Sequence, residues 1–508
     1  MSKQQSLKKN FVMNIILTVS GIIFPIISFP YVGRVLGPSG TGKVDFATSV
    51  VGYFALIAQL GTPTYGIRAC AKVRDDKRLL SKTVIELFTI NIVMTIISYV
   101  LLGLAIFFVP KFQTDKCLLL IISSTMFFNA IGIEYLYRGL EQYSYITLRS
   151  LVFKAIAFIS IFLLIKKAED YVVYGAITIF ATSASNIMNL LHSRKMVSLK
   201  KIGKLDIKQH IKPILLFLAM SCATTIYLCL DRVMLGFIKS DVDVGYYGAA
   251  VKIKSILVGI VTSLGAVLLP RASYYVEHGL MDEFRKITTK ALRFVFVVST
   301  PLMIFFIIFA RSGILVVSGE EYIPAVPAMQ FIMPTLLFIG ITNILGIQIL
   351  IPLGKERYVL YSEIAGAIID LVLNIWLIPA YGATGAAVGT VVAEFAVLIV
   401  QVVLLRKIYH ENPILDAFKQ INYTYILVAG LCASFSSLIL KKQLTSRVLI
   451  TCYKEEINVL INNSIVIVVS GLLFFGVYYI GMMLMKDEMM IEITSTILGK
   501  LKHKARQL

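Results

Sequence analysis

The chain has 508 residues, of which 57% are hydrophobic and only 15% are charged. A soluble chain of this length does not need so much apolar surface, whereas repeated apolar runs of about 20 residues are typical of membrane-spanning helices. The net charge of +20 would indicate nucleic-acid binding in a soluble protein, but in a membrane protein the positions of the charges have to be considered first.

The sequence alternates between long apolar runs and short polar connections, and we count about fourteen runs. They cover residues 11–32, 44–66, 84–109, 117–138, 148–165, 171–191, 213–238, 245–269, 292–317, 325–352, 358–379, 383–405, 421–440 and 464–485. The first run is too long for the core of a signal peptide, so we expect it to be a retained helix. An even number of runs places both termini on the same side of the membrane.

Basic residues are concentrated on one side of this predicted arrangement. The connections on the side of the termini carry 33 of the 49 Lys and Arg residues, the opposite connections carry 11, and five lie inside the runs. Because cytoplasmic connections are enriched in Lys and Arg, this bias predicts that both termini are cytoplasmic. It also accounts for the net charge without nucleic acid.

Two stretches contain the same features in the same order, which indicates an internal duplication. Residues 31–47 read YVGRVLGPSGTGKVDFA, and residues 227–250 read YLCLDRVMLGFIKSDVDVGYYGAA. Each has a base (Arg34 or Arg232), an LG pair ending at Gly37 or Gly236, a polar turn, and a glycine that opens the next run (Gly42 or Gly245). The G-x-E-x-Y pattern also recurs, at 139–143 and 354–358.

The duplication predicts an all-α polytopic membrane protein with two six-helix lobes. Repeats of equal orientation are related by an axis along the membrane normal, and a central cleft is expected between them. The predicted segments are an N-terminal lobe at 1–191, a cytoplasmic connector at 192–212, a C-terminal lobe at 213–407, and two extra helices with an amphipathic cytoplasmic tail at 408–508. Pro25 and Pro30 predict a bend in the first helix.

Four motifs of this sequence resemble those of a known family. RVLG at 34–37, GLEQYSYITLRS at 139–150, DRVMLG at 231–236 with VGYYGAAVKI at 244–253, and IPAYGATGAAVGT at 378–390 are similar to the bacterial polysaccharide repeat-unit flippases. These proteins, which serve O-antigen, capsule or exopolysaccharide synthesis, belong to the multidrug/oligosaccharidyl-lipid/polysaccharide exporter superfamily.

The resemblance implies a V-shaped helical fold around a central aqueous cavity in a bacterial cell membrane. It also implies transport of a polyprenyl-pyrophosphate-linked oligosaccharide from the inner to the outer leaflet, by alternating access. The partners would be this lipid-linked sugar and the bilayer, with a polysaccharide polymerase and glycosyltransferases as further candidates and no nucleic acid.

An anionic diphosphate in a membrane cleft needs cations, so the basic residues inside the runs are the first candidates for substrate binding. They are Lys154, Arg232, Lys252, Lys254 and Arg311. Lys252 lies on a small, polar helix face, whereas Lys254 points to the other side. We expect Arg34, Arg232, Lys252 and Arg311, with Asp231, to contact substrate. For Arg34 and Arg232 the alternative is snorkelling to the headgroups, and Arg232 can also pair locally with Asp231.

Two acidic residues, Asp370 and Glu394, lie near the middle of predicted membrane helices. Intramembrane acids either mark an ion pathway or pair with a buried base, and both interpretations stay open here. Glu134 and Arg138 are four residues apart, a spacing that favours an ion pair on one helix.

The two alternative functions for this sequence are an exporter and an enzyme. A drug or metabolite exporter of the same fold, driven by a cation gradient, is the nearest, but the first run lacks the acidic residue that such exporters commonly use. A membrane enzyme that polymerises sugars would need larger outer loops or paired metal-binding acids. We therefore expect a transporter with no catalytic residues, no metal site and no cofactor. The sequence has no match to G-x-x-x-x-G-K-[ST], so ATP is not expected to drive it directly.

Overall fold

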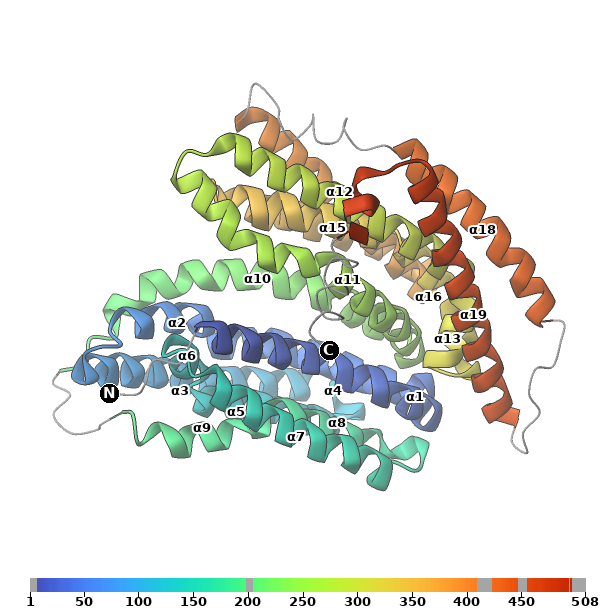
Figure 1. The fold of residues 1–508 in the computed structure, drawn as a ribbon. Helices are drawn as coiled ribbons and strands as arrows, with labels where there is room; N and C mark the ends of the chain where they lie inside the picture. The colour runs from blue at the N-terminus through green and yellow to red at the C-terminus, as the bar shows by residue number, and fades with distance from the viewer. Residues whose placement is uncertain (1–6, 198–203, 409–422, 446–454, 493, 496–508) are drawn as a thin grey trace, which may run out of the picture. The chain divides into compact units, whose positions relative to one another are not determined.

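A computed structural model describes residues 7–197, 204–408, 423–445, 455–492 and 494–495 (Figure 1). Every regular element in these ranges is a helix, and no strand occurs among the described residues. The prediction of an all-α fold is therefore confirmed. The end of the predicted amphipathic tail, residues 496–508, lies outside the described ranges.

Several helices have the length and composition of membrane spans. Within the described residues there are nine such stretches, or ten if the bent pair Glu320–Ile332 and Thr335–Leu350 forms one span. Two stretches, Val12–Lys72 and Glu356–Lys407, have 61 and 52 residues, far more than the ~20 that one crossing needs. The number of stretches is therefore not the number of crossings, and the total of fourteen stays a prediction.

Large apolar side chains point outward from these helices. Phe107, Phe108 and Trp376 are 72%, 72% and 76% exposed. Exposing such large apolar side chains to water would be costly, but the acyl chains of a membrane can cover them. The chain is thus a multi-pass membrane protein, as predicted.

The chain divides into two compact units, Met1–Gly248 and Ala249–Leu508. The first unit contains α1 Leu7–Gln59, α2 Thr62–Lys72, α3 Lys77–Phe108, α4 Pro110–Thr114, α5 Lys116–Gly132, α6 Glu134–Gly139, α7 Tyr143–Leu164, η1 Ala168–Asp170, α8 Tyr171–Ile179, η2 Phe180–Ala184, α9 Asn186–Ser193, α10 Lys208–Ile238 and the start of α11 Asp241–Glu277. Within this unit α1 packs along α3, α5 and α7 (Figure 1).

The first predicted run and most of the second form one element, α1, which changes direction at a single glycine. Gly37 has φ 63° and ψ 179°, and glycine tolerates a positive φ because it has no Cβ. Pro38 follows at the start of the second limb, where its missing N–H would have had no helical partner. Thr41 Oγ1 donates a hydrogen bond to the Gly37 carbonyl at 3.1 Å. The prediction of a polar turn between Gly37 and Gly42 is therefore wrong, because the residues between them are helical.

The second unit contains the rest of α11 and the remaining helices. They are α12 Met281–Ile308, α13 Ala310–Val317, η3 Glu320–Ala325, α14 Val326–Ile332, α15 Thr335–Asn343, η4 Ile344–Leu350, α16 Glu356–Ile408, α18 Tyr423–Thr445 and α19 Glu455–Leu484. Like α1, α16 changes direction at one glycine, Gly382, with φ 53° and ψ −129°. A Cβ on Gly385 would lie 2.2 Å from the Leu377 carbonyl oxygen, so small residues let the chain pack closely around this turn.

Candidate functional site

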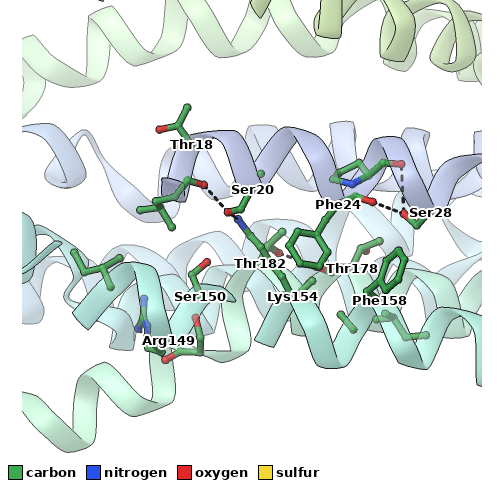
Figure 2. Close-up of a pocket in the computed structure, with 18 of the residues that line it drawn as sticks. Thr18, Ser20, Phe24, Ser28, Arg149, Ser150, Lys154, Phe158, Thr178 and Thr182 are labelled. Atoms are coloured by element: carbon green, nitrogen blue, oxygen red, sulfur yellow. Dashed lines mark hydrogen bonds between the residues drawn. The ribbon is translucent and has the colours of Figure 1, made fainter. Parts of the chain in front are cut away.

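The first unit contains a partly open cavity of about 550 Å³ between α1, α7 and the continuous stretch α8–η2 (Figure 2). The lining residues are Asn14, Leu17, Thr18, Ser20, Gly21, Phe24, Pro25, Ser28, Glu134, Arg138, Ile146, Arg149, Ser150, Lys154, Ala157, Phe158, Ile161, Tyr174, Ile177, Thr178, Ala181, Thr182 and Ser185. Its volume lies within the roughly 300–1,000 Å³ range of small-molecule sites. A cavity with many hydroxyl groups is unusual within an apolar helical bundle, so it is a candidate functional site.

Lys154 carries a positive charge into this cavity. Its Nζ donates a hydrogen bond to Ser20 Oγ at 2.9 Å, which connects α7 to α1 (Figure 2). A Cβ on Gly21 would lie 3.7 Å from Nζ, so the glycine leaves room beside the ammonium group. No carboxylate of the described residues lies within 4.0 Å of Lys154. The nearby hydroxyl solvates the charge but does not neutralise it.

Arg149 supplies a second positive charge from one turn earlier on α7. It is 7% exposed, and its Nη1 donates to the Ser185 carbonyl at 2.8 Å and to Asn186 Oδ1 at 3.4 Å. Its buried Nε has no hydrogen-bond partner among the described residues. A buried guanidinium with neutral partners keeps its full charge, and it therefore adds to the positive potential of the cavity.

The expected ion pair of Glu134 and Arg138 is confirmed. Arg138 Nη2 lies 2.7 Å from Glu134 Oε1, and Nε donates to the same oxygen at 2.9 Å. Both side chains also line a second cavity of about 290 Å³, together with Gln59, Thr62, Pro63, Thr64, Ile67, Asn91, Asn129, Tyr135 and Asn186. The pair thus forms a shared wall of two polar cavities within the first unit.

The remaining walls of the larger cavity combine rings and hydroxyls. The rings of Phe24 and Phe158 meet edge to face, with centroids 5.9 Å apart. Thr178 and Thr182 lie on α8 and on the π-helix η2, a helix type that is rare and frequently found at functional sites. Their hydroxyls donate to backbone carbonyls at 2.7 and 2.8 Å, which leaves their oxygens able to accept bonds from a ligand. Apolar rings, hydroxyls and cations together suit a polar, anionic ligand.

Three of the predicted substrate residues lie in the first unit but not in the lining of this cavity. Arg34 Nη1 donates to the Pro30 carbonyl at 2.5 Å. Asp231 is buried and accepts a hydrogen bond from Tyr247 Oη. Arg232 is partly buried, and its Nε has no hydrogen-bond partner among the described residues. None of the three belongs to the lining of either described cavity.

The other four predicted residues are distributed over the second unit. Lys252 is partly buried in α11, and Arg311 is exposed at the start of α13. Asp370 is fully buried, and Glu394 is 7% exposed, on the two limbs of α16. A Cβ on Gly389 would lie 3.2 Å from Asp370 Oδ1, so the second limb packs directly against this carboxyl group.

Sequence reasoning weighed Lys154 but did not include it among the expected substrate residues, and it missed Arg149. Lys154 was detectable as a cation within an apolar run. Arg149 lies at the border of a predicted connection, where hydropathy assigns a basic residue to the membrane surface. Its burial depends on the hydrogen bonds with Ser185 and Asn186, which lie about 36 residues away and leave no local signal.

Models of two known protein families match parts of this chain. The model of a family described as polysaccharide biosynthesis protein matches residues 7–276, more than half of the chain. The chain belongs to this family. The model of a second family, MatE, matches residues 217–376.

Two relatives can be aligned over most of this chain. A protein of Escherichia coli (strain K12) described as an O-antigen transporter is 22% identical over 407 residues, which cover 79% of this chain and 97% of that protein. A protein of the same description from Shigella dysenteriae is 24% identical and covers 77% of this chain and 98% of its own length.

Solved structures share the fold. The lipid II flippase MurJ in an inward closed conformation superimposes with a TM-score of 0.68 at 16% identity, over 93% of this chain and 100% of that one. A multidrug resistance MATE family transporter in an inward-facing conformation gives a TM-score of 0.60 at 14% identity, over 78% and 95% of the chains. The two-lobed transporter fold predicted from the duplication is confirmed.

Proposed function

We propose that this protein is a flippase that moves a polyprenyl-pyrophosphate-linked oligosaccharide from the inner to the outer leaflet by alternating access. Family membership, the description of two relatives as O-antigen transporters, and a fold shared with a lipid II flippase support this function. It is a transport function and not an enzymatic one. The energy source is either an ion gradient or the gradient of the lipid itself.

The observation that carries the proposal is a hydroxyl-rich, positively charged cavity inside a lobe whose outer surface is apolar. Each polar group of a sugar costs about 2–7 kcal/mol when it enters hydrocarbon without a hydrogen-bond partner. An oligosaccharide with roughly ten hydroxyls could not cross unaided at that cost. A polar cavity bordered by exposed apolar helices lets the head group stay hydrogen-bonded while the lipid tail remains in the bilayer.

The proposal extends to residues and to location. Arg34, Asp231, Arg232, Lys252 and Arg311 are proposed to contact the diphosphate or the sugars during the cycle, since Arg and Lys match phosphate and carboxylate oxygens. The proposed location is a bacterial cell membrane with both termini in the cytoplasm, which agrees with the distribution of basic residues. A polysaccharide polymerase and glycosyltransferases are the proposed neighbours in the same process.

The direct test is reconstitution of the purified protein in vesicles that contain a lipid-linked oligosaccharide. Exposure of the sugar on the opposite leaflet can be followed with a membrane-impermeant oxidant of sugars. We expect the wild type to accelerate exposure and Lys252→Ala to reduce the rate at least tenfold, whereas Lys254→Ala is the matched control from the same helix. A wild-type rate equal to that of protein-free vesicles would refute the proposed function.

A further inference from the structure

The cavity around Lys154 has an uncompensated positive charge. Its walls contribute three basic residues, Arg138, Arg149 and Lys154, and one acidic residue, Glu134. Glu134 is neutralised by Arg138 at 2.7 Å. Arg149 and Lys154 have no carboxylate within 4.0 Å among the described residues, and their hydrogen-bond partners there, Ser185, Asn186 and Ser20, are neutral. Because cations in a membrane usually face a partner of opposite charge, an anionic ligand would complete this site.

The apolar part of the cavity has the composition of a sugar-binding wall. The rings of Phe24 and Phe158 lie on facing helices, α1 and α7, with centroids 5.9 Å apart (Figure 2). A sugar ring has an apolar C–H face that packs on such rings and hydroxyls at its rim that need partners. The hydroxyls of Thr18, Ser150 and Thr182 provide those partners in the same cavity. The volume of about 550 Å³ accommodates a ligand of a few sugar units, not a whole repeat with its lipid.

The arrangement of the cations favours a singly charged group over a diphosphate. The Lys154 ammonium uses one of its three donors on Ser20 at 2.9 Å, which leaves two donors for a ligand. The Arg149 guanidinium, by contrast, uses its Nη1 on Ser185 and Asn186, and its Nε is buried. Neither of its two-donor edges is therefore fully open to a phosphate group. One partly buried ammonium with two remaining donors, in the same cavity as a buried guanidinium, matches a carboxylate.

From this combination we propose that the cavity around Lys154 binds a carboxylated sugar residue, of the uronate type, within the transported oligosaccharide. The proposal rests on the flippase function proposed above and specifies its substrate class. Lys154 pairs with the carboxylate, Arg149 adds to the positive potential, and Phe24 with Phe158 packs on the sugar ring. The protein would then favour lipid-linked oligosaccharides that contain an acidic sugar over neutral ones of the same length.

The binding step can be tested with small probes on the full-length protein in nanodiscs. Glucuronate, glucose and inorganic pyrophosphate are titrated separately, with saturation-transfer NMR as the measurement. We expect glucuronate to bind at least tenfold more tightly than glucose. Lys154→Gln should remove this preference, Lys154→Arg should retain most of it, and Lys166→Gln, at an exposed position outside the cavity, should leave it unchanged.

Three results would overturn the inference. They are equal affinities for glucuronate and glucose, an undiminished glucuronate affinity in a folded Lys154→Gln protein, and tighter Lys154-dependent binding of pyrophosphate than of glucuronate. The last result would assign the site to the lipid diphosphate instead of the sugar. Melting curves of the variants exclude loss of folding, and the wild-type comparison of glucuronate with glucose keeps the test valid if Lys154→Gln does not fold.

Transport measurements separate this inference from the proposed function. Vesicles are prepared with lipid-linked oligosaccharides that differ only by a uronate in place of a hexose. We expect wild-type protein to flip the acidic form at least tenfold faster, and Lys154→Gln to bring the two rates together. If the wild type flips both at the same accelerated rate, the flippase function stands and the acidic-sugar inference fails. If it flips neither, the proposed function itself fails.

Discussion

Gly42 and Gly245, the corresponding glycines of the two repeated motifs, each pack against the start of the other motif's second helical limb. A Cβ on Gly42 would lie 1.7 Å from the Asp241 carbonyl oxygen and 2.8 Å from the Gly245 nitrogen. A Cβ on Gly245 would lie 2.0 Å from the Pro38 carbonyl oxygen. Each glycine thus contacts the backbone carbonyl of the residue four positions before the other glycine. The contact is reciprocal, as expected for a local two-fold relation between the copies.

This contact predicts a large effect of adding one methyl group. Gly42→Ala places a Cβ on a backbone carbonyl that cannot rotate away, so α1 has to separate from the start of α11. Overpacking of this kind typically costs about 1–3 kcal/mol, and we expect a lower melting temperature of the purified protein.

Gly103→Ala is the matched control, because nothing lies within 4 Å of a Cβ at that position of α3. Alanine is about 0.5–1 kcal/mol more favourable than glycine inside a helix, so this variant should melt at the same or a higher temperature. An equal melting temperature for Gly42→Ala and the wild type would contradict the close contact.

The two repeated motifs could be recognised in the sequence, but the contact between them could not be predicted from it. The order of base, LG pair, turn and glycine reveals a duplication because it depends only on positions along the chain. Whether the copies touch depends on helix directions that are set at Gly37 and between α10 and α11. No periodicity encodes those directions. The sequence also suggested a polar loop after Gly37, since Pro38, Ser39 and Gly40 are turn residues, but a single positive φ suffices to start a new helical limb there.

An ion pair lies beside this glycine contact and should contribute a small, salt-sensitive stabilisation. Lys111 Nζ is 2.8 Å from Asp241 Oδ1, with side-chain exposures of 31% and 17%. The same ammonium lies 5.5 Å from the ring centroid of Phe46. For a partly exposed pair we expect a coupling of about 0.5–1 kcal/mol. A double-mutant cycle of Lys111→Met and Asp241→Asn, followed by chemical denaturation, measures it. The coupling should shrink at high salt, and additive single effects would show that the pair does not form.

The candidate cavity was partly accessible from sequence. Spacing alone predicted the pair of Glu134 and Arg138, because residues four apart share one helix face. Lys154 stood out as a charge in an apolar run, but its proximity to Ser20 joins residues 134 positions apart. The cavity requires that α1, α7 and the π-helix η2 pack together, and that packing is a property of the folded chain. Sequence patterns therefore could not predict cavity-lining residues such as Arg149.

A buried cluster around Glu86 should anchor the start of α10 to α3. Glu86 is 1% exposed and accepts hydrogen bonds from the Asp206 backbone N–H at 2.6 Å and from Gln209 Nε2 at 3.2 Å, while His210 Nε2 lies 2.8 Å away. Glu86→Gln replaces an acceptor oxygen with a donor nitrogen that faces other donors. We expect a loss of about 1.5–3 kcal/mol, the range for hydrogen bonds to charged groups, seen as a lower melting temperature.

Glu283→Gln is the control for that change of charge. Glu283 pairs with Lys286 at 2.9 Å, but the side chains are 50% and 73% exposed, so its loss should change stability by less than about 1 kcal/mol. If both variants melt at the same temperature, Glu86 does not anchor α10.

The carboxyl groups of Asp370 and Glu394 provide a test of ion coupling. Asp370 is fully buried on the first limb of α16, with the equally buried Asn374 one turn later, and Glu394 is 7% exposed on the second limb. A Cβ on Gly389 would lie 2.4 Å from Asn374 Oδ1 and 3.2 Å from Asp370 Oδ1, so the acid and the amide both face the second limb.

A buried carboxylate is costly unless a proton, a cation or a basic side chain offsets its charge. If a transported cation does so, Asp370→Asn and Glu394→Gln should each reduce the response of flipping to an imposed Na⁺ or proton gradient, by about tenfold for a loss of 1.4 kcal/mol. Glu356→Gln, at the exposed start of the same helix, should leave the response intact. An unchanged gradient response in both core variants, with a lower melting temperature, would assign the two acids to structural pairing within the second unit.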